Sequence, residues 1–348
     1  MLAAMLVIPS AWAEGADNAV ILLYHHVSDS TPASTSVTPA TFEQHLQYLA
    51  DGHNVISLEQ AIDQLKSAKP LPEHAVVITF DDGYSNIYDN ARPILARYKM
   101  PYTVFINPRQ IGKYDTQLTW QQVLEMEEAD ARFANHTAHH RHLLERTVDE
   151  SQSDWLAGIE QDIRESEAML KDKIGYSLQY LAYRYGEYNG DIQRLITKLG
   201  FVGFGQHSGA IYSGSDFTAL PRFPATGIYA NLDTLKIKIN SLALPVTSTS
   251  ALKSGAGRVV MSNAQAPGNF SFTFSGEDVL ATQLSCYFAN AVLPVSIDNH
   301  RVTVTLVQRL PVGRSRVNCT APSRAQPGRY YWYSQPWFVP RKDGTYPN

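Results

Sequence analysis

Two adjacent carboxylates, Asp81 and Asp82, follow an apolar run in the stretch VITFDDGYSNIYDNA at positions 77–91. Residues 75–80 have the composition of a buried strand, so both acids are expected at its carboxyl end. Like charges this close repel each other, and one is costly to keep ionised unless water or a cation lies beside it. A solvated turn or a helix N-cap is the alternative to a functional site.

The stretch ANHTAHHRHLLE at 134–145 contains four histidines: His136, His139, His140 and His142. His136 and His140 are four residues apart, so on a helical turn both imidazoles would lie on one face, about 5–6 Å apart at Cβ. This arrangement offers two nitrogens to one metal ion, and a solvated, histidine-rich turn is the alternative. Two histidines and one aspartate form a facial triad with room for water and substrate. We therefore expect one aspartate to bind a divalent metal and the other to act as a base toward water.

A third stretch, LAYRYGEYNG at 181–190, also follows an expected strand. A glycine turn after aromatic residues lets a backbone N–H point into a cleft. Arg184, Tyr185 and Tyr188 could line a site for a sugar, although this pattern indicates a function only together with the other two stretches.

Strand and helix patterns alternate over residues 18–244, which is typical of an α/β fold with a parallel sheet and helices outside it. Helix starts are expected after Thr38, Ser57 and Thr119. A proline directly follows Thr38, and a glutamine stands three residues after each of the other two, which strengthens the prediction. A long amphipathic helix is expected at 148–171. With this many units, a barrel-like closure is expected, and in such folds chemistry lies at the carboxyl ends of the strands.

The composition changes after residue 244. Residues 245–257, PVTSTSALKSGAG, are linker-like, and 258–348 contain short strand-like runs without a helix pattern, typical of a small β-sandwich. Cys286 and Cys319 both lie in this region, and we expect a disulfide rather than two unpaired core cysteines. Four aromatic residues either bind carbohydrate or pack the core: Tyr330, Tyr331, Trp332 and Trp337.

The N-terminal residues and the net charge of the chain indicate where the protein is located and which partners it has. The net charge is −4 with no basic tract, which argues against a nucleic-acid partner. The first residues, MLAAMLVIPSAWAEG, contain an apolar segment and an A-x-A pattern, typical of an export signal over 1–13; a buried N-terminal helix is the alternative. No later run of about 18 apolar residues would span a membrane. We expect an exported protein, periplasmic or extracellular.

Together, these stretches resemble the motifs of the NodB-type polysaccharide deacetylases, carbohydrate esterase family 4. TFDDG at 79–83 resembles the first motif and HTAHH at 136–140 the second, H-[ST]-x-x-H. ILLYHHV at 21–27 is similar to a signature of the branch that includes biofilm poly-N-acetylglucosamine deacetylases. The resemblance implies a distorted (β/α) barrel that removes N- or O-acetyl groups from glycans with a divalent metal, commonly zinc.

When the family's motifs are matched to this sequence position by position, the resemblance implies roles for five residues. Asp81 resembles the catalytic base, and Asp82, His136 and His140 resemble the metal ligands. The backbone N–H of Tyr185 resembles the oxyanion donor of the third motif.

The third motif departs from the family pattern R-x-P-[YFW]-G. Ala182 stands where the family has arginine, and Arg184 where it has proline, so we expect Arg222 in LPRF to orient the base instead. The family's L-x-H motif, which carries the general acid, is not found near the end of the barrel region. His25 and His207 are the candidates for that acid, and His207 fits a plain loop residue equally well.

The sequence therefore predicts a metal-dependent hydrolase, with zinc as the expected metal, that removes acetyl groups from an N-acetylated polysaccharide. A carbohydrate O-acetyl esterase is one alternative. A non-catalytic glycan-binding protein on the same fold, with the sandwich as its adhesive part, is another. The intact aspartate pair and the H-x-x-x-H spacing argue against the non-catalytic alternative.

Overall fold

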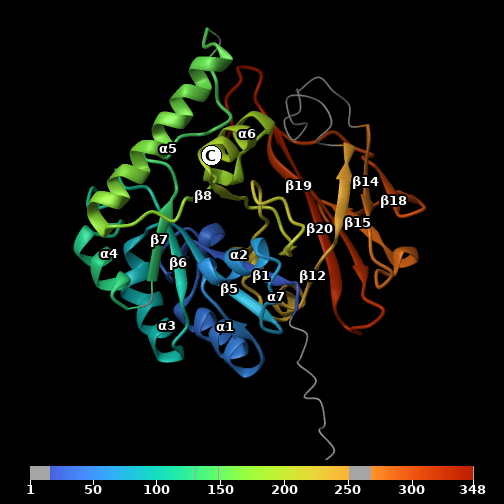
Figure 1. Ribbon diagram of the computed structural model, residues 1–348, viewed down its shortest axis with the longest axis horizontal. Helices are drawn as coiled ribbons and strands as arrows, with labels where there is room; N and C mark the ends of the chain where they lie inside the picture. The colour runs from blue at the N-terminus through green and yellow to red at the C-terminus, as the bar shows by residue number, and fades with distance from the viewer. Residues whose placement is uncertain (1–15, 130, 148, 251–267, 348) are drawn as a thin grey trace, which may run out of the picture.

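The expected parallel sheet is present in the computed structural model, which describes residues 16–129, 131–147, 149–250 and 268–347 (Figure 1). Its strands follow the order β10-β1-β5-β6-β7-β8-β9, with β4 beside β5 and β11 beside β1. Neighbours from β1 to β9 are parallel, whereas β10 is antiparallel to β1. The bounds are β1 (Ala19–Tyr24), β4 (Asn54–Val55), β5 (Ala75–Asp82), β6 (Tyr102–Ile106), β7 (Ala131–Asn135), β8 (Tyr180–Ala182), β9 (Val202–Phe204), β10 (Ala210–Ile211) and β11 (Phe223–Pro224).

The segment that precedes and includes β11 closes this sheet into a distorted barrel. Beside β9, the N–H of Leu220 donates to the carbonyl of Gly203, and the N–H of Gly205 donates to the carbonyl of Leu220, both at 2.8 Å. On the other side, β11 pairs with β1 and places Phe223 opposite Leu22. One segment therefore joins the two sides of the sheet, which confirms the expected barrel and places Arg222 at the closure.

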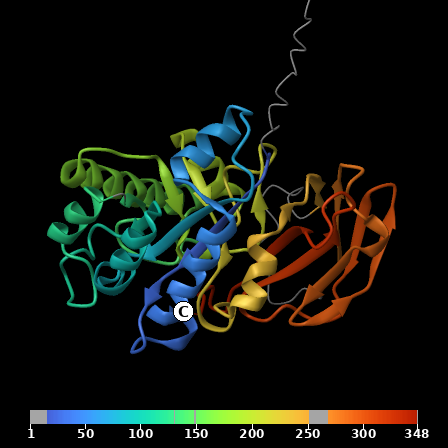
Figure 2. The same cartoon turned by 90° about the horizontal axis from the view of Figure 1, so that it is seen from below.

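Helices cover the outside of the barrel (Figures 1 and 2). The predicted N-caps are confirmed, because the side chains of Thr38, Ser57 and Thr119 each accept the backbone N–H three residues on, an interaction worth about 1 kcal/mol. The helix expected at 148–171 begins later, since Ser151 caps it. The bounds are α1 (Pro39–Gly52), α2 (Leu58–Lys66), α3 (Arg92–Tyr98), α4 (Trp120–Glu127), α5 (Gln152–Ile174), α6 (Gly190–Leu199) and α7 (Leu232–Ile239).

The C-terminal region forms the expected β-sandwich, shown beside the barrel in Figures 1 and 2. One sheet has the order β12-β20-β19-β15-β16 and the other β13-β14-β18-β17. Side chains of both sheets share one apolar core, in which Trp337 is 4% exposed. The bounds are β12 (Leu242–Ala243), β13 (Val246–Thr249), β14 (Asn269–Phe274), β15 (Ser285–Phe288), β16 (Ala291–Leu293), β17 (Val295–Asp298), β18 (Arg301–Thr305), β19 (Gly313–Pro322) and β20 (Tyr330–Val339).

Three expectations for this region can be compared with the structure. Cys286 and Cys319 form the expected disulfide between β15 and β19. The expectation of a linker from residue 245 is wrong for β13, which pairs with β14, because valine and threonine favour extended structure. Of the four aromatic residues, Trp337 packs in the core, whereas Tyr330 is 38% exposed. Residues 251–257 of the expected linker, and the first residues of the region expected to form the sandwich, lie outside the described residues.

The sandwich is packed against the barrel through its longest strands. Phe338 of β20 is 2% exposed and lies in an apolar cluster with barrel residues, its ring 5.9 Å from that of Tyr188. The ring of Trp332 meets Phe223 of the closing segment at 5.2 Å, and β12 pairs with β20. The Phe338 contact holds the end of β20 and the start of β19 against the residues that follow β8, and the Trp332 contact holds the other end of β20 against the closing segment.

Within the described residues, no helix is both long enough and apolar enough to span a bilayer. The export signal expected at 1–13 lies outside the described residues, so it stays a prediction.

Candidate active site

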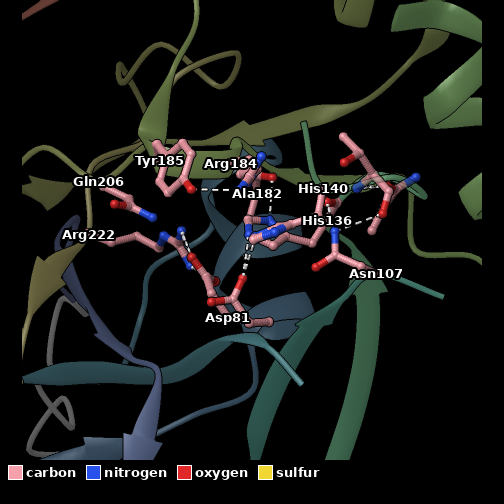
Figure 3. Close-up of polar contacts among 12 residues, drawn as sticks. Asp81, Asn107, His136, His140, Ala182, Arg184, Tyr185, Gln206 and Arg222 are labelled. Carbon is pink, nitrogen blue, oxygen red and sulfur yellow. Dashed lines mark hydrogen bonds and ion pairs between the residues drawn. The ribbon is translucent and has the colours of Figure 1, made fainter. Parts of the chain in front are cut away.

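Polar side chains converge at the carboxyl ends of the barrel strands (Figure 3). This is the edge at which parallel α/β barrels place their chemistry. Each position follows from the end of a strand: His25 comes after β1, Asp81 and Asp82 end β5, Asn107 follows β6, His136 follows β7, and Tyr185 lies three residues after β8.

Asp82, His136 and His140 form the cluster predicted for a metal. Their ligand atoms all lie within 4.8 Å of one another, and Asp82 Oδ1 is 3.3 Å from His136 Nε2 and 3.0 Å from His140 Nε2. Burial acts to raise the pKa of Asp82, but hydrogen bonds from the two histidines outweigh it and hold this pKa well below its usual value. A carboxylate kept ionised between two imidazoles is a suitable donor set for a divalent cation.

His136 is oriented by its other ring nitrogen. Nδ1 lies 2.8 Å from the carbonyl oxygen of Ala182, the last residue of β8. A carbonyl can only accept, so Nδ1 carries a proton. Burial acts to lower the pKa of His136, but Asp81 and Asp82 outweigh it and raise this pKa, so Nε2 also carries a proton toward Asp82. A bound cation would take the place of that proton on Nε2. Such a support fixes the ring and the tautomer of a metal-binding histidine. The residues present therefore fit a bound cation.

The expectation of a helical turn between His136 and His140 is wrong. The segment after β7 is irregular, with left-handed φ values of 64° at Thr137 and 50° at His140. Asn135 Oδ1 accepts the N–H of Thr137 at 2.7 Å, and Asn107 Nδ2 donates to the carbonyls of His136 and Thr137. The two imidazoles meet because side-chain amides fold the loop.

The other two histidines of this loop have structural partners. Asp162 of α5 is buried, and its Oδ1 accepts the N–H groups of Ala138 and His139 at 3.0 Å and lies 2.8 Å from His139 Nδ1. His142 Nδ1 lies 2.7 Å from Oε1 of the buried Glu187. No local sequence pattern indicates a role for Asp162, because it lies in the middle of an amphipathic helix.

Asp81 is held by Arg222, as predicted. Both residues are 0% exposed, and the guanidinium makes a two-pronged ion pair with the carboxylate, NH1 to Oδ1 at 2.7 Å and NH2 to Oδ2 at 2.8 Å (Figure 3). Burial acts to raise the pKa of Asp81, but the charge of Arg222 outweighs it and the pKa lies below its ordinary value. This arrangement keeps the carboxylate ionised and fixes its plane.

Tyr185 lies in a strained turn beside the cluster. Its φ is 54°, and its ring centroid is 6.1 Å from His140 and 4.3 Å from His142. Arg184 NH2 donates to the Tyr185 hydroxyl at 2.6 Å. Tyr188, which was expected to line a sugar site, is 4% exposed and packs on Tyr183.

The two candidate acids lie in different surroundings. Burial lowers the pKa of His25, while the carboxylates of Asp82 and Asp81 act to raise it. Burial also lowers the pKa of His207, to about 3, and the charges acting on it are those of Arg316 and Arg222. Both pKa values lie below the ordinary value for histidine, and the assignment of the acid stays a prediction.

Comparison with known proteins relates this chain to polysaccharide deacetylases. The model of the polysaccharide deacetylase family matches residues 68–204. A putative polysaccharide deacetylase, YxkH of Bacillus subtilis, is 30% identical over 204 residues, which are 58% of this chain and 69% of that protein. The poly-beta-1,6-N-acetyl-D-glucosamine N-deacetylase of Staphylococcus epidermidis is 30% identical over 232 residues, covering 59% of this chain and 78% of the relative.

Solved structures share the barrel. IcaB from Ammonifex degensii superposes with a TM-score of 0.57 at 25% identity, over 65% of this chain and 98% of that one. The Streptococcus pyogenes deacetylase PplD, solved with acetate, gives a TM-score of 0.57 at 23% identity, over 64% of this chain and 98% of that one, and this likeness shows the fold alone.

The chain belongs to the polysaccharide deacetylase family. The resemblance inferred from TFDDG, HTAHH and the alternating strands and helices is thereby confirmed, together with the NodB-type fold and the enzyme class.

Proposed function

We propose that this chain is a metal-dependent hydrolase that removes acetyl groups from an N-acetylated polysaccharide of the N-acetylglucosamine type. The observation that carries the proposal is the adjacency of two units, the cluster of Asp82, His136 and His140 and the buried Asp81–Arg222 ion pair. The names of the staphylococcal relatives, which describe N-deacetylases of poly-beta-1,6-N-acetyl-D-glucosamine, support the choice of substrate.

Asp82, His136 and His140 would hold the cation. Two imidazoles with one carboxylate suit zinc, and cobalt or nickel would also fit. When bound, a divalent cation supplies Lewis-acid polarisation of the acetyl carbonyl and lowers the pKa of water.

The chain's own residues then account for the proton movements. Asp81, ionised and fixed by Arg222, accepts a proton from the water that attacks the acetyl carbon. The N–H of Tyr185 donates to the oxyanion of the tetrahedral intermediate. The C–N bond breaks as His25 gives a proton to the leaving amine, which releases acetate and leaves a free amine on the sugar.

Acetate release from an N-acetylglucosamine oligosaccharide tests the proposal. We expect release by the native protein, loss with a chelator and recovery when zinc is added back. Asp81→Asn should keep the metal and lower turnover by about 10²–10⁴-fold, whereas His136→Ala should lose the metal. His139→Ala, in the same loop but bonded to Asp162, is the matched control and should keep both metal and activity. The reverse pattern for Asp81 and His136 would refute the assigned roles.

The role of His25 separates amide from ester hydrolysis. An amine leaves only when protonated, whereas an alkoxide leaves more readily. His25→Asn should therefore lose activity on the N-acetylated oligosaccharide but keep activity on an O-acetyl ester, and His207→Asn should keep both. Equal loss on the two substrates would contradict a role of His25 as the acid. A native protein that hydrolyses only the ester would instead identify an O-acetyl esterase.

We also propose that the protein is exported to the periplasm or the cell exterior. The A-x-A pattern before residue 14 and the disulfide between Cys286 and Cys319 support this location.

A further inference from the structure

One side chain of the β-sandwich reaches the turn that contains Tyr185. Arg314 of β19 donates through NH1 to the carbonyl of Tyr185 at 2.8 Å and to Oε1 of Gln206 at 3.0 Å. Its guanidinium carbon also lies 4.9 Å from the centroid of the Tyr185 ring. Both hydrogens of NH1 are therefore donated to residues at the candidate site. Arg314 is 129 residues from Tyr185 in the sequence.

The docking of the sandwich places Arg314 there. Arg314 pairs in register with Phe338 of β20, and Phe338 is buried in the cluster that contains Tyr188 of the barrel. Arg316, two residues on and so on the same face of the strand, donates more weakly to the carbonyl of Gln206 at 3.4 Å. The start of β19 is thus fixed against the barrel by an apolar contact on its neighbouring strand.

The peptide unit between Tyr185 and Gly186 is held at both of its polar atoms. Arg314 binds its carbonyl, and the N–H of Gly186 donates to the carbonyl of Tyr183 at 2.8 Å. A side chain at 186 would clash with Gln206, since a Cβ there would lie 2.8 Å from the Gln206 nitrogen. With this peptide fixed, the left-handed φ of Tyr185 sets the direction of its own N–H.

We propose that Arg314 is a positioning residue for deacetylation, which holds the Tyr185 turn so that the Tyr185 N–H meets the oxyanion. The inference rests on the proposed function, because it takes the Tyr185 N–H as the oxyanion donor. It makes the sandwich a part of the active site rather than a separate adhesive module.

The test compares Arg314→Ala with Arg316→Ala, its neighbour on the same face of β19, in the full-length protein. We expect Arg314→Ala to lower kcat by about 10–100-fold, with KM, metal content and Tm close to native values. Arg316→Ala should lower kcat by less than about threefold, because its hydrogen bond is long and is made to the carbonyl of Gln206 rather than to Tyr185. Millimolar guanidinium should restore part of the kcat of Arg314→Ala, and Arg314→Lys should be intermediate, since an ammonium can donate but cannot stack in the same way.

Hydrogen exchange at residues 183–187 gives a readout that needs no substrate. These amides should exchange faster in Arg314→Ala than in Arg316→Ala or the native protein. Equal kcat in the two variants, or a loss seen only in KM, would overturn the inference. If the native protein binds metal but releases no acetate, the proposed function is refuted. Unchanged hydrogen exchange at residues 183–187 in Arg314→Ala would separately refute the role of Arg314 in holding the turn.

Discussion

The barrel buries charged side chains, whereas in the described part of the sandwich the buried polar side chains are uncharged. The buried charged residues of the barrel include Asp81, Asp162, Glu187 and Arg222. Those of the sandwich that are buried and polar are Ser271, Ser323, Ser334 and Gln335. A buried charge is tolerated only with a partner, and each of the four in the barrel contacts the candidate site or the loop beside it.

This difference shows how each region responds to the loss of a buried side chain. Besides its apolar core, the barrel contains paired groups that are costly to desolvate, so removing one partner leaves a buried charge alone. The sandwich depends on an apolar core and the Cys286–Cys319 disulfide. Chemistry is thus built into the barrel at a cost in stability, and the sandwich supplies a rigid support.

The largest effect is expected from Arg222→Met. It leaves the Asp81 carboxylate buried without its ion-pair partner, which should cost about 3–5 kcal/mol of unfolding free energy and most of the activity. Denaturant unfolding and acetate release measure the two losses. Arg97→Met, which removes an ion pair to Glu43 with side chains 55% and 44% exposed, is the control and should cost less than about 1 kcal/mol. Similar costs for the two variants would show that burial of the Asp81–Arg222 pair does not decide its effect on stability.

Removal of the disulfide should come next. Cys286 and Cys319 close a loop with a sequence separation of 33 residues, so the double variant Cys286→Ala/Cys319→Ala should lose about 3–4 kcal/mol in the chain-entropy model. Hydrogen exchange should locate the loss in the sandwich strands. On warming, acetate release should fall before the barrel unfolds, because Arg314 leaves the Tyr185 turn. Sandwich peptides that exchange as slowly as in the native protein would contradict this expectation.

The smallest effect is a pH dependence confined to the barrel. Burial raises the pKa of Glu167 to about 7, although the hydrogen bond from Asn135 acts to lower it. The folded protein therefore favours the protonated acid. Stability from this group is full below the unfolded pKa, near 4.5, and is lost as the pH rises through about 7. Glu167→Gln should therefore be about 1 kcal/mol more stable than the native protein at pH 8.

Thermal unfolding between pH 5 and pH 8 measures this difference. Glu165→Gln, on the same helix but in a surface ion pair with Arg109, is the matched control and should follow the native profile. If the Tm of Glu167→Gln falls between pH 5 and pH 8 as steeply as the Tm of the native protein, another group causes the pH dependence of stability.

The residues of the candidate site were predictable where they form a local pattern. Asp81 and Asp82 end a recognisable strand, and His136 and His140 have a fixed spacing. Arg222 was predicted because Ala182 stands where the family pattern has arginine, and the structure confirms the contact of Arg222 with Asp81. The assigned roles stay predictions until activity is measured.

Other parts depend on contacts that no local pattern reveals. The loop after β7 has left-handed residues that are not glycine, so the sequence pointed wrongly to a helical turn. Asp162 and Arg314 are single charged residues in ordinary helix and strand patterns, and only the packing of distant elements brings them to the site. The strand β13 was missed because its polar, threonine-rich composition is shared by linkers.

The position of Arg222 in the closing segment sets an order of assembly. The side chains proposed as ligands are separated by at most 58 residues, the separation of Asp82 and His140, whereas Arg222 is 141 residues from Asp81. Long-range contacts form late in folding, because their loop-closure entropy must be offset first. A chain folded only through β8 could gather Asp82, His136 and His140, yet Asp81 would still lack its ion-pair partner. Competence for hydrolysis therefore arrives with the last step of barrel closure, so activity reports a completely folded barrel.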